Sequence, residues 1–161
     1  MPVTMPPCRN VNLLAPELQS LVLIAQGIAE NMGLESIVIE TWRDPARHAQ
    51  LYAQGRTEPG PIVTWTQHSA HCDRKAVDIG LTLKGKLLQG RNAKEIAIYR
   101  GFLMALLRDA RCDKRIWSMG LTRGRDFFHL QLDGEPSREN IMRGKTPAQL
   151  KRQLPQPAEK T

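Results

Sequence analysis

The sequence predicts an α+β fold in which a small antiparallel sheet is flanked by helices. Two long segments carry apolar residues at helical spacing, and several short segments are β-branched or alternate between apolar and polar residues. The 161 residues are enough for about one domain with a substantial core. We therefore expect a single domain over residues 1–161, with its core at about 13–133 and a basic, partly flexible tail at 134–161.

The first two elements are a helix and a strand. Apolar residues recur every three or four positions over Leu18–Met32, with a proline near the start and Gly33 just past the end. This pattern is typical of an amphipathic helix. The β-branched run Ser36–Thr41 then predicts a strand that ends at Arg43.

A short helix and a loop follow. Asp44 is suited to cap a helix, Pro45 to occupy its first position, and Gly55 to close it. Arg43 is therefore expected at a junction between a strand and a helix. Residues 56–67 contain prolines and a glycine without any sustained period, so we expect a loop there.

The middle of the chain predicts a second strand and the central helix. Residues Ala76–Leu81 alternate in the manner of a strand. Asn92 and Glu95 form a capping box, and apolar residues at helical spacing continue from there to Ala110. We expect this helix to be the main one of the domain.

Two further strands are expected, at Ile116–Met119 and at Phe127–Leu132. The second of them would hold His129 on a rigid element beside the strand that carries Asp78. After these strands the chain is polar and rich in proline, with a possible basic helix at Met142–Leu154.

Composition narrows the range of functions. The net charge is +7, from 23 Lys and Arg against 16 Asp and Glu, which favours polyanionic partners such as nucleic acid, anionic lipid or the bacterial cell wall. The three cysteines are far apart, so we expect neither a disulfide framework nor a thiolate zinc site. The apolar runs are too short for a membrane span, and no secretory signal is visible.

Two short motifs carry chemistry. Ser69-x-His71 is followed by Asp78, and Asp126-x-x-His129 lies about fifty residues further on. Two imidazoles and one carboxylate leave a position of a tetrahedral zinc open for water, which is typical of a catalytic site. The pattern therefore predicts metal-assisted hydrolysis, with His71, Asp78 and His129 as ligands and Asp126 as general base and later proton donor.

Each of these residues also has a plainer explanation. A histidine among apolar residues, such as His129, is more often a half-buried side chain than a ligand. Asp78 could bond backbone amides at the end of a strand, and Asp126 could cap a turn. Arg43 alone could be a surface cation or an ion-pair partner.

Four motifs occur together in this chain: Thr41-Trp42-Arg43-Asp44-Pro45, the segment from Leu51 to Thr64, Ser69-x-His71 to Asp78-Ile79, and Asp126-x-x-His129. With these motifs the sequence resembles a known family, the zinc peptidases that include D-alanyl-D-alanine carboxypeptidases and phage L-alanyl-D-glutamate endopeptidases. The resemblance extends over roughly Leu34 to Leu132. The Leu-Tyr-Ala-Gln-Gly-Arg-Thr-x-Pro-Gly stretch points to the endopeptidase branch found in phage endolysins.

The resemblance implies one bound zinc ion with the three ligands named above and Asp126 as the catalytic base. It implies that Arg43 holds the substrate carbonyl or its developing oxyanion, and that Ser69 orients the substrate near the metal. His48 occupies a position where the family usually has a glutamine that lines the substrate cleft, so we also expect it to contact substrate.

The chain departs from the family pattern at two other places. Arg74 stands where the family usually has glycine, and Trp117-Ser118-Met119 replaces a Trp-Gly-Gly segment. Cys72, next to a ligand, could bind a soft metal, but the ligand set is complete without it.

The expected function is that of a phage or prophage endolysin, a zinc-dependent peptidase that cleaves the L-alanyl-D-glutamate bond of peptidoglycan stem peptides. We expect a monomer that binds peptidoglycan and not nucleic acid, made in the host cytoplasm and acting on the periplasmic wall after release. The basic tail could add attraction to the wall. Two alternatives stay open: a D-Ala-D-Ala carboxypeptidase, and a non-catalytic wall- or nucleic-acid-binding module.

Overall fold

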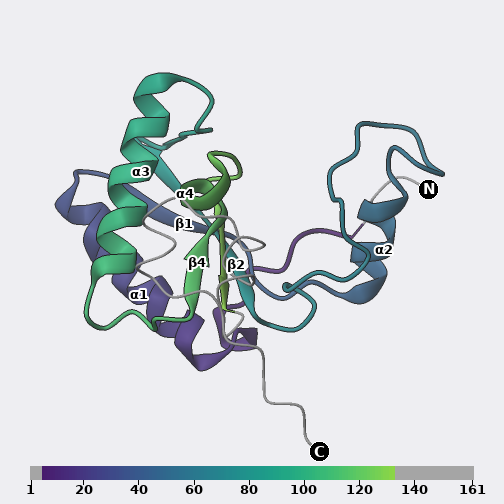
Figure 1. The fold of residues 1–161 in the computed structure, drawn as a ribbon, viewed down its shortest axis with the longest axis horizontal. Helices are drawn as coiled ribbons and strands as arrows, with labels where there is room; N and C mark the ends of the chain where they lie inside the picture. The colour runs from purple at the N-terminus through teal and green to yellow at the C-terminus, as the bar shows by residue number, and fades with distance from the viewer. Residues whose placement is uncertain (1–4, 133–161) are drawn as a thin grey trace, which may run out of the picture.

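The computed structural model describes residues 5–132 (Figure 1). The predicted basic tail and its helix at Met142–Leu154 lie outside the described residues. In chain order the elements are η1 (Val11–Leu13, a 3-10 helix), α1 (Pro16–Asn31), β1 (Glu35–Glu40), α2 (Pro45–Ala53), β2 (Ala76–Leu83), β3 (Lys86–Leu87), α3 (Ala93–Arg108), β4 (Ile116–Ser118), α4 (Met119–Arg123) and β5 (His129–Leu132).

The strands form one sheet in the order β1-β2-β5-β4, with the short β3 also paired to β2. Every pair is antiparallel. The predicted α+β class, with a small antiparallel sheet flanked by helices, is therefore confirmed. The pairing of β2 with β5 matters most for function, since it joins segments that are far apart in the sequence.

The two faces of the sheet differ. Val77, Ile79 and Leu81 alternate along β2 and belong to the buried apolar core. Helix α1 packs on β1 and β2, and α3 packs on α1 and β4. Figure 1 shows α1 and α3 together on one side of the sheet, with α2 and the long segment after it away from them. The residues between the core positions, Asp78 among them, therefore face away from α1 and α3.

The predicted helix caps are present. The Oδ1 atom of Asp44 accepts a hydrogen bond from the backbone N–H of Ala46 (2.8 Å), with Pro45 at the first turn of α2. At α3 the Oδ1 atom of Asn92 accepts from the N–H of Glu95 (2.9 Å). These bonds satisfy N–H groups that have no partner within the helix, and they place Arg43 directly before α2 as predicted.

Several boundaries differ from the prediction. The first strand, expected to end at Arg43, ends at Glu40. The strand expected to reach Met119 ends at Ser118, because the Oγ atom of Ser118 accepts from the N–H of Leu121 (3.3 Å) and caps the unpredicted helix α4. The last strand begins at His129, two residues later than expected. Asp126 has a φ of +53°, in the left-handed region, which interrupts an extended run before the strand.

A hairpin was also missed. The strand expected to end at Leu81 continues to Leu83 and turns back into β3. The two turn residues, Lys84 and Gly85, have φ angles of +51° and +78°, the signs that a two-residue hairpin turn requires. Lysine is an uncommon first residue in such a turn, so the residue pattern predicts this hairpin only weakly.

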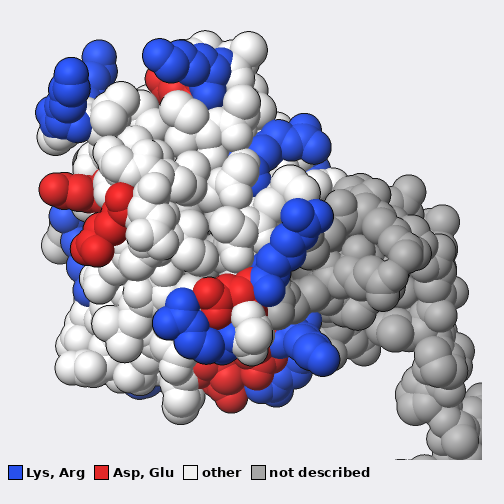
Figure 2. Space-filling view, turned by 90° about the vertical axis from the view of Figure 1, so that its left-hand side faces the viewer, with Lys and Arg blue, Asp and Glu red and all other residues white. Residues whose placement is uncertain are grey.

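None of the helices within residues 5–132 is long and apolar enough to cross a membrane. Figure 2 shows that, on the left-hand side of the molecule as drawn in Figure 1, basic and acidic side chains lie in small groups, several of them mixed, with uncharged surface between the groups.

Tyr99 connects α3 to the sheet through its hydroxyl group. Its side chain is fully buried, its O–H donates to the backbone oxygen of Leu88 (2.7 Å), and its oxygen accepts from the N–H of Leu81 (2.9 Å). Burial raises the pKa of Tyr99 to about 12. The neutral phenol is thus part of the folded state.

We expect Tyr99→Phe to lower the free energy of unfolding by about 2 kcal/mol, because two buried backbone groups lose their partner. In the parent protein the contribution of the phenol is complete below about pH 10, the pKa expected after unfolding, and is lost as the pH rises toward 12. Urea unfolding at neutral and alkaline pH measures both effects. Tyr52→Phe is the matched control, since the Tyr52 ring stacks on Arg56. A Tyr99→Phe protein as stable as the parent would contradict this role.

Candidate metal centre

Three predicted ligands meet at the face of the sheet that is turned away from α1 and α3. Asp78 on β2 and His129 on β5 are direct partners in the antiparallel pairing, so their side chains project to the same side. His71 reaches them from the loop before β2, as predicted. The sheet register therefore brings together residues that lie 51 positions apart.

The geometry of the three side chains suits one ion. The Nε2 atom of His71 and the Nδ1 atom of His129 both lie 3.2 Å from the Oδ1 atom of Asp78. One possible ligand atom from each residue lies within 4.8 Å of the other two. These three residues therefore form a group that could hold a metal ion.

Hydrogen bonds on the outer side of each ring fix the tautomers. The Nδ1–H of His71 donates to the backbone oxygen of Thr41 (2.8 Å), and the Nε2–H of His129 donates to the Oε1 atom of Gln131 (2.9 Å). In the neutral rings the opposite nitrogens then carry lone pairs that point at Asp78. Outer partners of this kind orient histidine ligands and raise their basicity.

Electrostatics keep the group in a form suited to a cation. Burial alone would raise the pKa of Asp78, but the bonds from His129 and His71 outweigh it and hold this pKa far below its usual range. Burial alone would lower the pKa of His129, and the bond to Asp78 reverses the effect and raises it. A bound cation would therefore replace a proton that the cluster otherwise attracts.

Thr41, Gln131 and Trp117 are parts of this centre that sequence reasoning missed. Gln131 lies two residues after His129 on the same strand, so the period of a strand could have placed it on the same face. The indole of Trp117 packs edgewise on the His129 ring, with centroids 6.3 Å apart. The contribution of Thr41 comes from its backbone oxygen, for which a sequence carries no signal.

Asp126 lies close enough to Asp78, His129 and His71 to interact with their charges, and it does not belong to the group that could hold a metal ion. Its surface is exposed, yet nearby protein atoms partly desolvate the carboxyl and the charge of Asp78 adds to this, so its pKa is raised. Its φ of +53° lies in the left-handed region, which Asp tolerates better than most residues, and its backbone oxygen accepts from the N–H of His129 (3.3 Å). The backbone of Asp126 is thus held next to His129.

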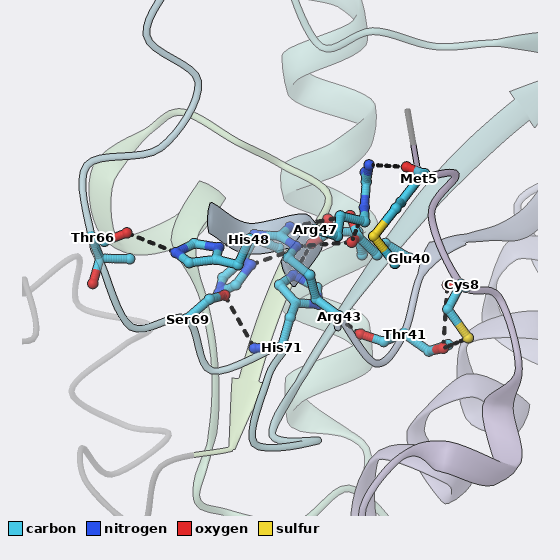
Figure 3. A network of polar contacts seen from close by, with 12 residues as sticks. Met5, Cys8, Glu40, Thr41, Arg43, Arg47, His48, Thr66, Ser69 and His71 are labelled. Carbon is cyan, nitrogen blue, oxygen red and sulfur yellow. Dashed lines mark hydrogen bonds and ion pairs between the residues drawn. The ribbon is translucent and has the colours of Figure 1, made fainter. Parts of the chain in front are cut away.

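Arg43, Ser69 and His48, predicted to contact substrate, all lie near His71 (Figure 3). The backbone N–H of Arg43 donates to the backbone oxygen of His71 (3.1 Å), and the Oγ atom of Ser69 accepts from the N–H of His71 (3.2 Å). Ser69 is 6% exposed and His48 is 3% exposed, with both ring nitrogens of His48 in hydrogen-bond contacts. These contacts are structural, and the substrate roles of the three residues stay predictions.

The structure shows the surroundings of Arg74 and Cys72, two residues near the first candidate ligand. Arg74 has a φ of +64°, so the backbone keeps a conformation in which glycine is favoured. Its guanidinium lies over the Trp42 ring, 5.9 Å from the centroid, a favourable contact at a strained position. Cys72 is not part of the metal-binding group, and burial raises the pKa of its thiol.

A hollow of about 450 Å³ lies between α2 and the loop that leads to His71. Residues of α2, including His48 and Tyr52, form one wall, and Cys72 and Asp73 belong to the other. His48, which stands where the family usually has a glutamine, is among the residues that line this hollow. The hollow therefore opens next to the segment that carries the first ligand.

Comparison with known proteins finds similarity to solved structures. No protein-family model matches the chain, and no curated protein sequence does. The chain is similar to the crystal structure of the L-Ala D-Glu endopeptidase ChiX from Serratia marcescens, with a TM-score of 0.59 and 22% identity over 77% of this chain and 84% of that chain. The resemblance inferred from the motifs is thus confirmed for the fold. The chain has the fold of this endopeptidase and carries on its sheet a His-Asp-His group that could bind a metal ion.

Proposed function

We propose that this protein is a zinc-dependent peptidase that cleaves peptidoglycan stem peptides. One observation carries the proposal: His71 and His129 turn their lone-pair nitrogens toward one carboxylate oxygen of Asp78, while their other nitrogens donate to Thr41 and Gln131. Two imidazoles and a carboxylate are the ligand set of several catalytic zinc sites. The fold of ChiX supports peptidoglycan as the substrate.

When bound by these three residues, zinc supplies Lewis-acid chemistry, since it polarises a carbonyl group and makes a water molecule more acidic. The chain supplies the proton transfers. Asp126 takes a proton from the attacking water and later gives it to the leaving amine, for which its raised pKa is favourable. Asp126 is exposed, so water and substrate can reach it.

Arg43 is proposed to donate hydrogen bonds to the substrate carbonyl oxygen and to stabilise the negative charge that develops there. A guanidinium is permanently charged and its N–H groups are fixed in a plane, which suits an oxyanion. Ser69, beside His71, is proposed to orient the substrate. The tie between the backbones of Arg43 and His71 fixes these groups relative to each other.

The scissile bond is proposed to be the one between L-alanine and D-glutamate, and the protein to be a phage endolysin that reaches the periplasmic wall after release from the host cytoplasm. The motif at Leu51–Gly60 and the L-Ala D-Glu endopeptidase activity of ChiX support this choice of scissile bond. The net charge of +7 supports an anionic polymer as the target.

The proposal predicts that purified protein contains about one zinc per chain and converts isolated sacculi or muropeptides to products cut between alanine and glutamate. A chelator should abolish this activity and added zinc should restore it. Mass spectrometry of the products together with metal analysis measures both.

The rival functions give different results in the same experiment. Loss of a single terminal alanine, with the alanine-glutamate bond intact, would identify a D-Ala-D-Ala carboxypeptidase. Binding to sacculi without any cleavage in the presence of zinc would identify a non-catalytic wall-binding module. Binding to nucleic acid that weakens steeply with salt would identify a nucleic-acid binder.

A further inference from the structure

A buried ion-pair cluster lies where β1 ends and α2 begins (Figure 3). Glu40 is 5% exposed, and its Oε1 and Oε2 atoms accept from the Nε (2.8 Å) and Nη2 (3.1 Å) atoms of Arg43. Arg47 donates from Nε to the same Oε1 atom (3.1 Å) and from Nη1 to the backbone oxygen of Met5 (2.6 Å). Burial alone would raise the pKa of Glu40, but the bonds from both arginines outweigh it and lower this pKa. The carboxylate therefore stays ionised and accepts two hydrogen bonds from one edge of the Arg43 guanidinium.

His48 holds the same guanidinium from a second direction. Its Nδ1 atom lies 3.1 Å from the Nη1 atom of Arg43, and its Nε2 atom lies 2.8 Å from the backbone oxygen of Thr66. A guanidinium can only donate and a carbonyl can only accept, so Nδ1 is the acceptor and Nε2 carries the proton. The neutral ring thus connects Arg43 to the loop between α2 and His71.

The donors of Arg43 can be counted. A guanidinium has five N–H groups. Glu40 takes the one on Nε and one on Nη2, and His48 takes one on Nη1. One N–H on each terminal nitrogen is left without a hydrogen-bond partner among residues 5–132, and the side chain is 11% exposed. These two groups can reach an oxygen atom that enters the site.

We propose that Glu40 and His48 are positioning residues, which hold Arg43 so that its two remaining N–H groups meet the carbonyl oxygen of the scissile peptide. The inference rests on the proposed peptidase function. A long arginine side chain has many rotamers, and catalysis falls steeply when a charge-stabilising group is displaced by even 1 Å. The two contacts remove this freedom before substrate binds. Because His48 also bonds Thr66, the position of Arg43 depends on the loop.

The test compares two substitutions of His48 in the full-length, zinc-loaded protein with a stem-peptide substrate. His48→Leu removes the acceptor for Arg43, and we expect kcat to fall about 10- to 100-fold with KM changed less than about 3-fold. His48→Gln can accept from Arg43 and donate to Thr66, so it should restore kcat to within about 3-fold of the parent. Gln19→Leu is the control, because Gln19 lies on α1, on the other side of the sheet, and the change likewise removes a side-chain hydrogen bond to a backbone oxygen, here that of Leu14 (2.9 Å).

A double-substitution cycle separates positioning from a general structural effect. If His48 acts through Arg43, His48→Leu should cause no further loss of kcat in an Arg43→Ala protein. Full kcat in His48→Leu, no rescue by His48→Gln, or an equal loss with and without Arg43 would overturn the proposal. Glu40→Gln leaves two arginines without their buried counter-charge and can unfold the protein. The comparison of His48→Leu with His48→Gln is therefore the decisive test.

A second measurement does not depend on peptidase activity. In the 15N NMR spectrum, the Arg43 guanidinium should show an Nε–H signal that exchanges slowly with water and terminal N–H groups that rotate slowly. Arg43→Lys assigns the signal by its loss. The rotation should become faster in His48→Leu and not in His48→Gln. A freely rotating guanidinium in the parent would overturn the positioning role, whereas a parent that shows the held guanidinium but cleaves no stem peptide would overturn only the proposed function.

Discussion

His129→Ala should remove both bound zinc and peptidase activity. Within residues 5–132, His129 supplies one of the three candidate ligand atoms, and its Nδ1 atom lies 3.2 Å from the Asp78 carboxylate. Loss of an outer partner of a ligand typically costs 10- to 100-fold in metal affinity, so loss of the ligand itself should cost more than about 100-fold. Metal analysis after gel filtration and cleavage of sacculi measure the two effects.

Thermal unfolding gives a third readout of the same change. Zinc at about 1,000 times its dissociation constant should stabilise the parent by about 4 kcal/mol, and this gain should vanish in His129→Ala. Gln131→Ala should show an intermediate loss of affinity, of about 10- to 100-fold, because the His129 ring then loses the acceptor of its Nε2–H. His68→Ala is the matched control for metal content. Unchanged zinc content in a folded His129→Ala protein would refute the assigned ligand set.

Asp126→Asn should keep zinc and lose turnover. The amide has nearly the same shape as the carboxylate, and asparagine tolerates the φ of +53° found at this position, so the backbone should not change. An amide cannot take a proton from water, and loss of a general base typically lowers the rate about 100- to 10,000-fold. We expect a fall of kcat in this range with zinc content equal to that of the parent.

The control for Asp126→Asn is Asp113→Asn. Asp113 pairs with Arg115 near the start of β4 and contributes no atom to the metal centre. Asp113→Asn makes the same chemical change, from a carboxylate to an amide, outside the proposed site. Turnover should therefore stay close to that of the parent. An Asp126→Asn enzyme with full activity would show that another group takes the proton. Loss of zinc in this variant would instead make Asp126 a ligand.

Local sequence patterns predicted most elements of the fold. The periods of apolar residues gave α1 and α3, and the caps Asp44 and Asn92 gave the starts of α2 and α3. The elements that were missed are short. Helix α4 depends on the cap that Ser118 makes, and β3 depends on a two-residue turn. Elements of two to five residues contain too few positions to show a period.

In the candidate metal centre, too, some residues were predicted from the sequence and others were not. The three candidate ligands and the neighbouring Asp126 could be predicted because the chemistry of each depends on its side chain, and the side chain follows directly from the residue type. The partners that fix the ligands were not predicted. The His71 ring bonds the backbone oxygen of Thr41, 30 positions earlier, and any residue type at position 41 could supply that atom.

The amino-acid sequence by itself determined the α+β class, the main helices and strands, and the set of side chains able to hold a metal ion. Only the tertiary structure decided which nitrogen of each histidine faces Asp78, how Glu40 and His48 hold Arg43, and that Arg74 keeps a left-handed backbone. The reason is that spacing along a chain encodes helix and strand periods. Hydrogen bonds between distant segments exist only once the sheet register and the loop paths have set the distances and angles between them.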